Sequence, residues 1–363
     1  MKNPFKFGTI VDEPYFINRK KEMEKVKSVL ASENHLVMIS PRRFGKSSLI
    51  FKTVKPLNRP VVAVDIQLVT SPADLTAQIL KRIYRFYPSE KLKQHIKKFR
   101  VIPTLSLNPV TGSIDVSFMP EASYVPILED VLNLAEKVST AKRKIIMVFD
   151  EFQDAKKTDA DLLQHMRAIM QHHRMINYVF LGSQESLIRE IFQKKKSPFY
   201  HFGLVMNLSK IEAKEFRQFL SDGFSNICQN PGSIADKILA VTKCHPHYTQ
   251  QLAFTVWERA SSQPDEAVMV SEAVNELITT HDTDYERIWL NFNRTDRKML
   301  LGISMSELPP LSDAFNRMWG VGASSTAFSS LKRLMSSGFI IKTDKYELDD
   351  PFFSKWLRER RER

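Results

Sequence analysis

The sequence predicts an α/β protein: a parallel sheet flanked by helices, followed by two smaller, mainly helical parts. Three observations lead to this prediction. Mostly apolar runs occupy residues 36–39, 60–68, 144–149 and 178–181, and such runs are typical of strands buried on both faces of a parallel sheet. Helix-forming stretches separate them, as expected where parallel strands alternate with crossover helices. From about residue 212 onward the pattern is helical, except for two short apolar segments near the end.

A tight loop between the first apolar run and the next helix carries a clear chemical signal. Residues 35–50 read HLVMISPRRFGKSSLI, close to the phosphate-binding pattern G-x-x-x-x-G-K-[ST]. Backbone N–H groups and a helix N-terminus bind phosphate in such a loop. We expect Lys46 to reach the β- and γ-phosphates and Ser47 to ligate Mg²⁺. The predicted nucleotide-binding residues here are Ser40, Pro41, Arg42, Arg43, Phe44, Gly45, Lys46, Ser47 and Ser48.

A second motif lies farther along the chain. Residues 144–151 read KIIMVFDE, a buried-strand pattern that ends in two carboxylates. Hydrolysis at a loop of this type needs an acid at the end of a neighbouring strand to hold the metal. Asp150 is the predicted Mg²⁺ ligand, and Glu151 is placed to orient and deprotonate the attacking water. The alternative is a buried strand followed by acids that begin a helix.

Polar residues follow three of the predicted strands. They are the loop that starts at Ser40, the pair Asp150 and Glu151, and Ser183 after the run at 178–181. Ligands of open parallel sheets bind at the carboxyl ends of the strands. The convergence of these residues therefore predicts a functional site at that edge.

The chain divides by pattern into four parts. Residues 1–30 are expected to form a strap and a helix, 31–210 the sheet domain, 211–282 a helical bundle and 283–363 a winged helix-turn-helix. The last part has three helices, two short strands and a final helix in that order. Within the sheet domain, residues 101–118 alternate in polarity around 108–112 and predict an inserted β-hairpin. Its tip either touches a partner or is an inert decoration.

Composition restricts the class of protein. The chain has 53 basic and 41 acidic residues, a formal net charge of +12, which favours polyanionic partners without identifying one. No stretch approaches the roughly 18 apolar residues of a membrane span, and the N-terminal residues lack the apolar core of a signal peptide. Two cysteines, Cys228 and Cys244, suggest no disulfide framework. We therefore expect a cytoplasmic protein with no membrane partner.

With these motifs the chain resembles the archaeal-type ATPases of the STAND branch of AAA+-like P-loop NTPases. The resemblance covers nearly the whole chain, from the FINR entry at 16–19 through PRRFGKSSL, FDEFQ, FLGSQ and CHPHY to the terminal YELDDPFFSKWLR. It implies ATP or ADP with Mg²⁺, clamped between the P-loop core and a helical lid at 211–282. It also implies base-side contacts and a γ-phosphate sensor. The residues that match these roles are Phe16, Ile17, Arg19 and Pro246 for the base side and Ser183 for the sensor.

Some of these matches have a structural alternative, and three positions depart from the family pattern. Phe16 and Ile17 fit ordinary core burial as well, and Ser183 fits a helix cap. The departures are Ser40 for the first loop glycine, Cys244 for the lid glycine, and Phe202 where an arginine is frequent. An arginine near the γ-phosphate can raise the rate about 10³–10⁵-fold. The sequence assigns no such arginine, although Arg42, Arg43 and Arg189 lie in or near the motifs, so we expect slow hydrolysis or a partner that supplies the charge.

Two functions follow from these patterns. The first is an ATP-binding switch that weakly hydrolyses ATP to ADP and phosphate and acts on DNA through the helix at 325–335, with Lys332 and Arg333 as the contacts. The alternative is a slow-turnover signalling or scaffold protein whose winged helix binds another protein or a second copy of the chain. Zinc binding at Cys244, His245 and His247 is not expected, since neighbouring residues alternate in direction and no metal-ligand spacing occurs.

Overall fold

A computed structural model describes residues 2–107, 114–119, 123–260 and 266–361. It divides into two compact units. The sheet unit comprises Lys20–Ser40 and Leu49–Leu208, and the helical unit comprises Met1–Arg19, Pro41–Ser48 and Ser209–Arg363. Each unit has its own hydrophobic core. In the described part of the chain, every helix falls short of the length and apolar character that crossing a membrane requires.

The sheet unit is built on five parallel strands in the order β2-β5-β6-β1-β7. They are β1 (Leu36–Ile39), β2 (Val61–Asp65), β5 (Ile145–Asp150), β6 (Ile176–Gly182) and β7 (Leu204–Asn207). Every residue of β1 and β6 is buried, which is why these strands are apolar without alternation. The predicted α/β class with a parallel sheet is confirmed.

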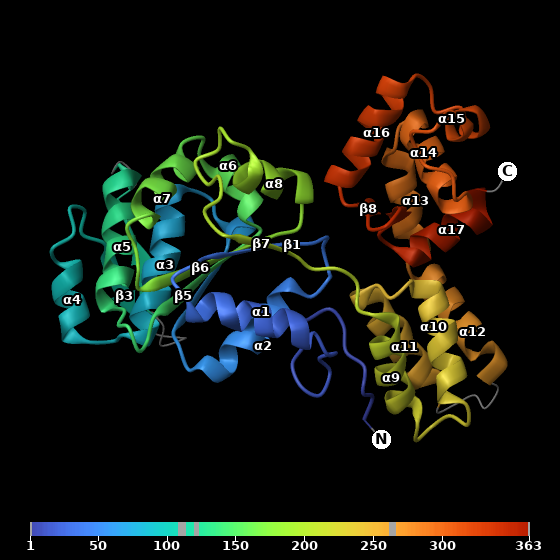
Figure 1. The fold of residues 1–363 in the computed structure, drawn as a ribbon, viewed down its shortest axis with the longest axis horizontal. Coiled ribbons are helices and arrows are strands. Elements are labelled where there is room, and N and C mark those ends of the chain that lie inside the picture. The colour runs from blue at the N-terminus through green and yellow to red at the C-terminus, as the bar shows by residue number, and fades with distance from the viewer. Residues whose placement is uncertain (1, 108–113, 120–122, 261–265, 362–363) are drawn as a thin grey trace. The chain divides into compact units, whose positions relative to one another are not determined.

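Helices cover both faces of this sheet (Figure 1). Helix α1 lies on one face, and α3, α5 and α7 lie on the other. Ser71 caps α3, because its hydroxyl accepts a hydrogen bond from the Asp74 N–H at 3.1 Å. The helices that precede or connect the strands are α1 (Lys20–Ala31), α2 (Lys46–Val54), α3 (Pro72–Phe86), α4 (Glu90–Ile96), α5 (Tyr124–Val138), α6 (Ala155–Thr158), α7 (Leu162–Met170) and α8 (Glu185–Gln193).

An insertion precedes α5. Strands β3 (Thr104–Leu107) and β4 (Ile114–Ser117) pair antiparallel, and the predicted hairpin tip at 108–112 lies outside the described residues. Lys81 of α3 forms an ion pair with Asp115 of β4 at 2.6 Å. The hairpin is therefore anchored to the body of the sheet unit.

The helical unit begins with a bundle of four helices. These are α9 (Ala213–Phe224), α10 (Pro231–Thr242), α11 (Pro246–Ala260) and α12 (Glu266–Thr280). The N-terminal strap packs on this bundle, since the Phe5 ring lies 4.8 Å from that of Phe224. The side-chain amide of Gln250 also donates to the carbonyl oxygen of Tyr15 at 3.0 Å.

A winged helix completes the helical unit, as predicted. Asn293 caps the second helix of this part, which starts at Arg294, by accepting a hydrogen bond from the Asp296 N–H at 2.9 Å. The wing is the antiparallel pair β8–β9. The elements are α13 (Asp282–Asn291), α14 (Arg294–Met305), α15 (Asp313–Trp319), α16 (Ser324–Ser336), β8 (Ile340–Lys342), β9 (Tyr346–Leu348) and α17 (Pro351–Arg361).

Candidate functional site

The predicted phosphate loop connects β1 to α2 and has an unusual backbone. Arg43 and Gly45 have positive φ angles of 62° and 89°. Alternation of right- and left-handed residues in a short loop turns successive N–H groups toward one side, which is how backbone nests bind anions. The Lys46 side chain is only 6% exposed, and its ammonium donates to the Pro41 carbonyl oxygen at 3.0 Å. Ser40 is not among the residues with positive φ in the described chain, so this position does not require a glycine.

Two contacts within the helical unit brace the loop. The Arg19 guanidinium donates to the carbonyl oxygens of Phe44 at 3.4 Å and Ser209 at 2.7 Å. The Ser48 hydroxyl accepts a hydrogen bond from the Val11 N–H at 3.1 Å. Arg19 is buried, and its guanidinium links the backbone of the loop to that of Ser209.

The loop also contacts the first turn of α11. The Arg43 guanidinium donates to the Tyr248 hydroxyl at 3.1 Å and lies 5.8 Å from the centre of its ring. The Phe44 ring meets that of His245 edge-on at 4.9 Å. Pro246, half-buried at the first position of α11, lies between these two contact residues in the sequence. The loop and the predicted lid motif are therefore joined by side chains within one unit.

Acidic residues gather at the carboxyl ends of β2 and β5 in the sheet unit. Asp65 and Asp150 are register partners at the ends of these strands. Burial raises the pKa of Asp65, and the negative charges of Asp150, Glu151 and Asp154 raise it further, while a hydrogen bond from the Gln67 N–H opposes the rise. Because negative charge is concentrated here, the position favours a cation.

Glu151 follows β5 and is held in a strained conformation. Its φ angle is 49°, a left-handed value that costs a non-glycine residue on the order of 1–3 kcal/mol and is often found at functional sites. Its Oε2 accepts hydrogen bonds from the Ser183 hydroxyl at 2.6 Å and from the Gln153 side-chain amide at 2.5 Å. Ser183 comes directly after β6, the strand next to β5. The sheet order therefore brings together two residues that the sequence separates.

Other predicted residues have different surroundings. Ile17 belongs to the hydrophobic core of the helical unit, which agrees with the alternative that it is an ordinary core residue. Phe16 is half-buried.

Two arginines near the motifs and the lid cysteine have different surroundings again. Arg42 is exposed. Arg189 donates to the Asn207 side chain at 2.8 Å. At Cys244 the φ angle is 59°, a value that favours glycine, which explains physically why a glycine suits this position of the lid motif.

On α16, the two predicted DNA contacts differ. Lys332 is exposed. The Arg333 guanidinium instead donates two hydrogen bonds to Asp296 of α14, at 2.9 and 2.6 Å, and Asp296 is only 3% exposed. Arg333 is therefore engaged in holding two helices of the winged helix together.

Sequence reasoning missed three residues: Asp65 and Gln153 in the sheet unit, and Tyr248 in the helical unit. Asp65 ends an apolar run in the same way as Asp150, so the rule applied to Asp150 would have found it. Gln153 lies in the FDEFQ segment, but only the turn after β5 shows that it reaches Glu151. No sequence signal pairs Tyr248 with Arg43, because the contact joins distant segments.

Comparison with known proteins agrees with this architecture. A family model described as "ATPase domain predominantly from Archaea" matches residues 16–252, and one described as "Probable winged helix domain" matches residues 283–359. No curated protein sequence matches the chain.

Solved structures show the same fold. A Walker-type ATPase of Pyrococcus abyssi is similar with a TM-score of 0.70 at 17% identity, over 98% of this chain and 99% of that chain. The ORC2 protein of Aeropyrum pernix, in ADPNP-ADP complexes, has a TM-score of 0.58 at 15% identity, over 98% and 96%. The ORC1 protein of Aeropyrum pernix, in complex with DNA, has a TM-score of 0.50 at 14% identity, over 95% and 93%. The family match spans more than half of the chain, and the chain therefore belongs to this predominantly archaeal family of ATPase domains.

Proposed function

We propose that this chain is an ATP-binding switch that requires Mg²⁺ and slowly hydrolyses ATP to ADP and phosphate. The observation that carries the proposal is the loop after β1, with left-handed residues at Arg43 and Gly45 and the buried Lys46 ammonium above its backbone. Such loops bind phosphate groups through backbone N–H groups and a lysine. The family match and the nucleotide complexes of the ORC2 protein support this reading.

The proposed roles follow the chemistry of each side chain. Lys46 neutralises charge on the terminal phosphates, while Ser47 and Asp150 hold Mg²⁺. The residues fit this ion because Mg²⁺ is usually bound by one or two carboxylates together with substrate phosphates. The described residues contain no group of three histidine, cysteine or acidic side chains suited to a metal, so a cage made entirely of protein ligands is not proposed. When bound, Mg²⁺ neutralises charge that develops on the phosphates.

Glu151 is the proposed base. Ser183 and Gln153 both donate to its Oε2. The two donors fix the carboxylate plane, so that the other oxygen can accept a proton from a water. Ser183 acts in this proposal as a positioning residue for Glu151, in addition to its family role as a γ-phosphate sensor.

The contacts of Arg43 and Phe44 with Tyr248 and His245 support a switch. A nucleotide that reorders the loop would change these contacts at the first turn of α11. Because the same helix packs in the core that includes the winged helix, a change at the loop can reach the C-terminal part of the chain. This coupling is the proposed output of ATP binding.

The winged helix has two candidate partners. DNA is supported by the net charge of +12 and by the DNA complex of the ORC1 protein, with Lys332 as the exposed cation of α16. A protein partner is favoured by the exposed apolar side chains of α15 and α16, because Met318 is 64% exposed and Phe328 57% exposed. With Arg333 engaged by Asp296, α16 offers little charge for phosphate contacts.

Two measurements test the proposal. Calorimetry with ATP and Mg²⁺ should show binding by the natural chain and none by Lys46→Ala, with both variants equally folded by circular dichroism. Equal ATP affinity in the two proteins would contradict the assignment of the loop. Duplex binding across a salt series separates the two partners, since contact with phosphates weakens steeply as salt rises. Absence of duplex binding at low salt would favour the protein partner.

A further inference from the structure

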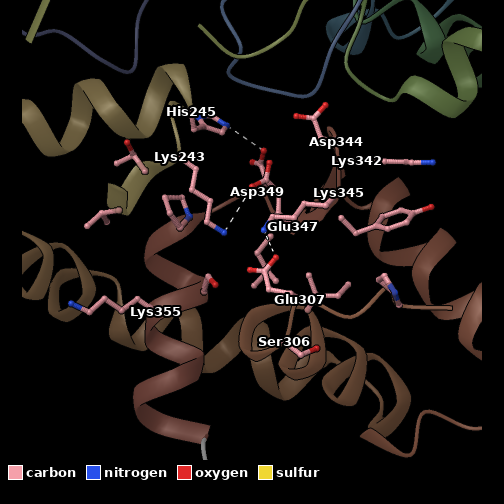
Figure 2. A pocket seen from close by; sticks show the side chains of 18 of the residues that line it. Lys243, His245, Ser306, Glu307, Lys342, Asp344, Lys345, Glu347, Asp349 and Lys355 are labelled. Carbon is pink, nitrogen blue, oxygen red and sulfur yellow. Dashed lines mark hydrogen bonds and ion pairs between the residues drawn. The ribbon is translucent and has the colours of Figure 1, made fainter. Parts of the chain in front are cut away.

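A cavity of about 460 Å³ lies within the helical unit (Figure 2). Its walls come from the end of α10, the segment after α14, the wing and α17. Ligand pockets in proteins typically measure roughly 300–1,000 Å³. None of the residues that line the cavity belongs to the predicted nucleotide-binding set, so a ligand here would occupy a separate site.

Charged side chains dominate one part of the lining. Six are cationic and four are acidic, which leaves an excess of two positive charges. Figure 2 shows Lys243 and Lys345 directed toward the carboxylates in the centre, whereas Lys342 and Lys355 extend outward. The cations are Lys210, Lys243, Lys342, Lys345, Lys355 and Arg358, and the acids are Glu307, Asp344, Glu347 and Asp349.

The carboxylates do not fully satisfy the central cations. Glu347 is 6% exposed and pairs closely with Lys210 at 2.6 Å, whereas Lys243 stays 4.0 Å from the same carboxylate. Lys345 pairs with Glu307, whose side chain is 82% exposed. Exposed ion pairs contribute little to stability, so an incoming anion can replace Glu307 at small cost.

Lys243 lies among other cations, and its side chain is 48% exposed. Partial burial lowers the pKa of its ammonium, the positive charges of Lys345, Arg358 and Lys210 lower it further, and the carboxylate of Glu347 raises it. An anion bound beside Lys243 would relieve this repulsion. The electrostatics of the cavity therefore favour a negatively charged ligand.

The other part of the lining is apolar. It consists of Val241, Ile303, Leu308, Pro309 and Pro310. A fully inorganic anion would leave this wall exposed to water. A ligand with an anionic group at one end and an apolar or aromatic body at the other fits both parts.

We propose that this cavity binds a small organic phosphate, with the phosphate beside Lys243 and Arg358 and the organic body against Leu308 and Pro309. Phosphate suits the site because several donors from different elements can reach its oxygens at once. Lys243 lies next to the Cys244–His245 segment that precedes α11, and the wing supplies Lys345. A ligand here would thus link the winged helix to the predicted lid, independently of the phosphate loop.

Calorimetry with phenyl phosphate and with inorganic phosphate as probes tests the proposal. The titrations use the Lys46→Ala chain, so that the phosphate loop does not contribute. We expect one phenyl phosphate per chain, bound more tightly than inorganic phosphate. A second chain carries Lys243→Asn and Arg358→Gln together with Lys46→Ala. It should bind phenyl phosphate about tenfold more weakly or worse, the loss expected when at least 1.4 kcal/mol of binding energy is removed. Asparagine tolerates the left-handed backbone of position 243, and Arg358 is exposed, so both changes should preserve folding.

Two further variants sharpen the result. Lys237→Gln changes an exposed cation of α10 that does not line the cavity and should leave binding unchanged. Leu308→Ala should weaken phenyl phosphate but not inorganic phosphate. The proposal would be overturned if the Lys46→Ala chain did not bind phenyl phosphate. It would also be overturned if the chain with Lys243→Asn and Arg358→Gln bound phenyl phosphate as tightly as the Lys46→Ala chain. A third outcome would overturn it as well: the chain binds duplex DNA but not phenyl phosphate, and the Lys243→Asn and Arg358→Gln substitutions abolish the DNA binding. That result would identify these cations as part of a nucleic-acid surface.

Discussion

Arg333 allows a direct test of whether α16 uses its cations for structure or for DNA. The Asp296 carboxylate accepts four hydrogen bonds, from the Ser330 hydroxyl at 2.5 Å, the Asn293 amide at 2.9 Å and the Arg333 guanidinium at 2.9 and 2.6 Å. Arg333→Ala removes the last two and leaves a buried carboxylate without its cation. Breaking a buried ion pair costs about 3–5 kcal/mol.

The cost in this protein should be smaller, because the Arg333 side chain is 49% exposed and water can partly replace it. Two of the four hydrogen bonds to Asp296 also remain. We therefore expect a loss of roughly 2 kcal/mol in the local stability of the winged helix. Hydrogen exchange of the α14 and α16 amides should then be about 30-fold faster, since 1.4 kcal/mol corresponds to a factor of about ten.

Mass spectrometry of amide exchange in the full-length chain measures this effect. Lys332→Ala is the matched control, because Lys332 is the exposed neighbour on the same helix and its loss should change stability by no more than about 0.5 kcal/mol. Arg333→Lys keeps the charge but not the paired geometry and should fall between the two. If Arg333→Ala exchanges no faster than Lys332→Ala, the structural role assigned to Arg333 is wrong.

Three further predictions concern the site and the core. Glu151→Gln should lower steady-state phosphate release at least about 100-fold, because the base is lost, while ATP affinity measured by calorimetry stays unchanged; equal release would refute the role. Ser183→Ala should lower release about tenfold, since it removes one charge-assisted hydrogen bond of about 1.5–3 kcal/mol from Glu151, and a normal rate would show that Gln153 suffices. Burial and the charges of Arg167 and His173 lower the pKa of His35 from 6.5 to about 4. Stability should therefore be complete above pH 6.5 and fall by roughly 3 kcal/mol toward pH 4, and urea unfolding of His35→Gln should lack this part of the pH dependence.

The sequence was sufficient to predict elements whose pattern is local. A parallel strand buried on both faces must be apolar throughout, so residues 36–39 and 144–149 were recognisable as strands. The GKS segment follows such a strand within one short loop, so the spacing along the chain was enough to recognise it. Helix α4 was missed because its seven residues are too few for a helical period to be distinguished from a loop.

Side-chain partners were beyond reach of the sequence. Ser183 meets Glu151 only because β6 lies beside β5, and the sequence of one strand does not specify which strand lies next to it. Arg333 looked like an exposed DNA contact because its partner Asp296 lies on another helix, 37 residues away in the chain.

The sequence alone determined the class of this protein: the α/β fold, the phosphate loop and the carboxylates after β5, because each depends on residues adjacent in the chain. The tertiary structure decided which of its charges are engaged. It committed Arg333 to Asp296 and Arg43 to Tyr248, and it gathered cations from separate elements around one cavity. The physical reason is that electrostatic interactions depend on distance in space, which the order of residues does not specify.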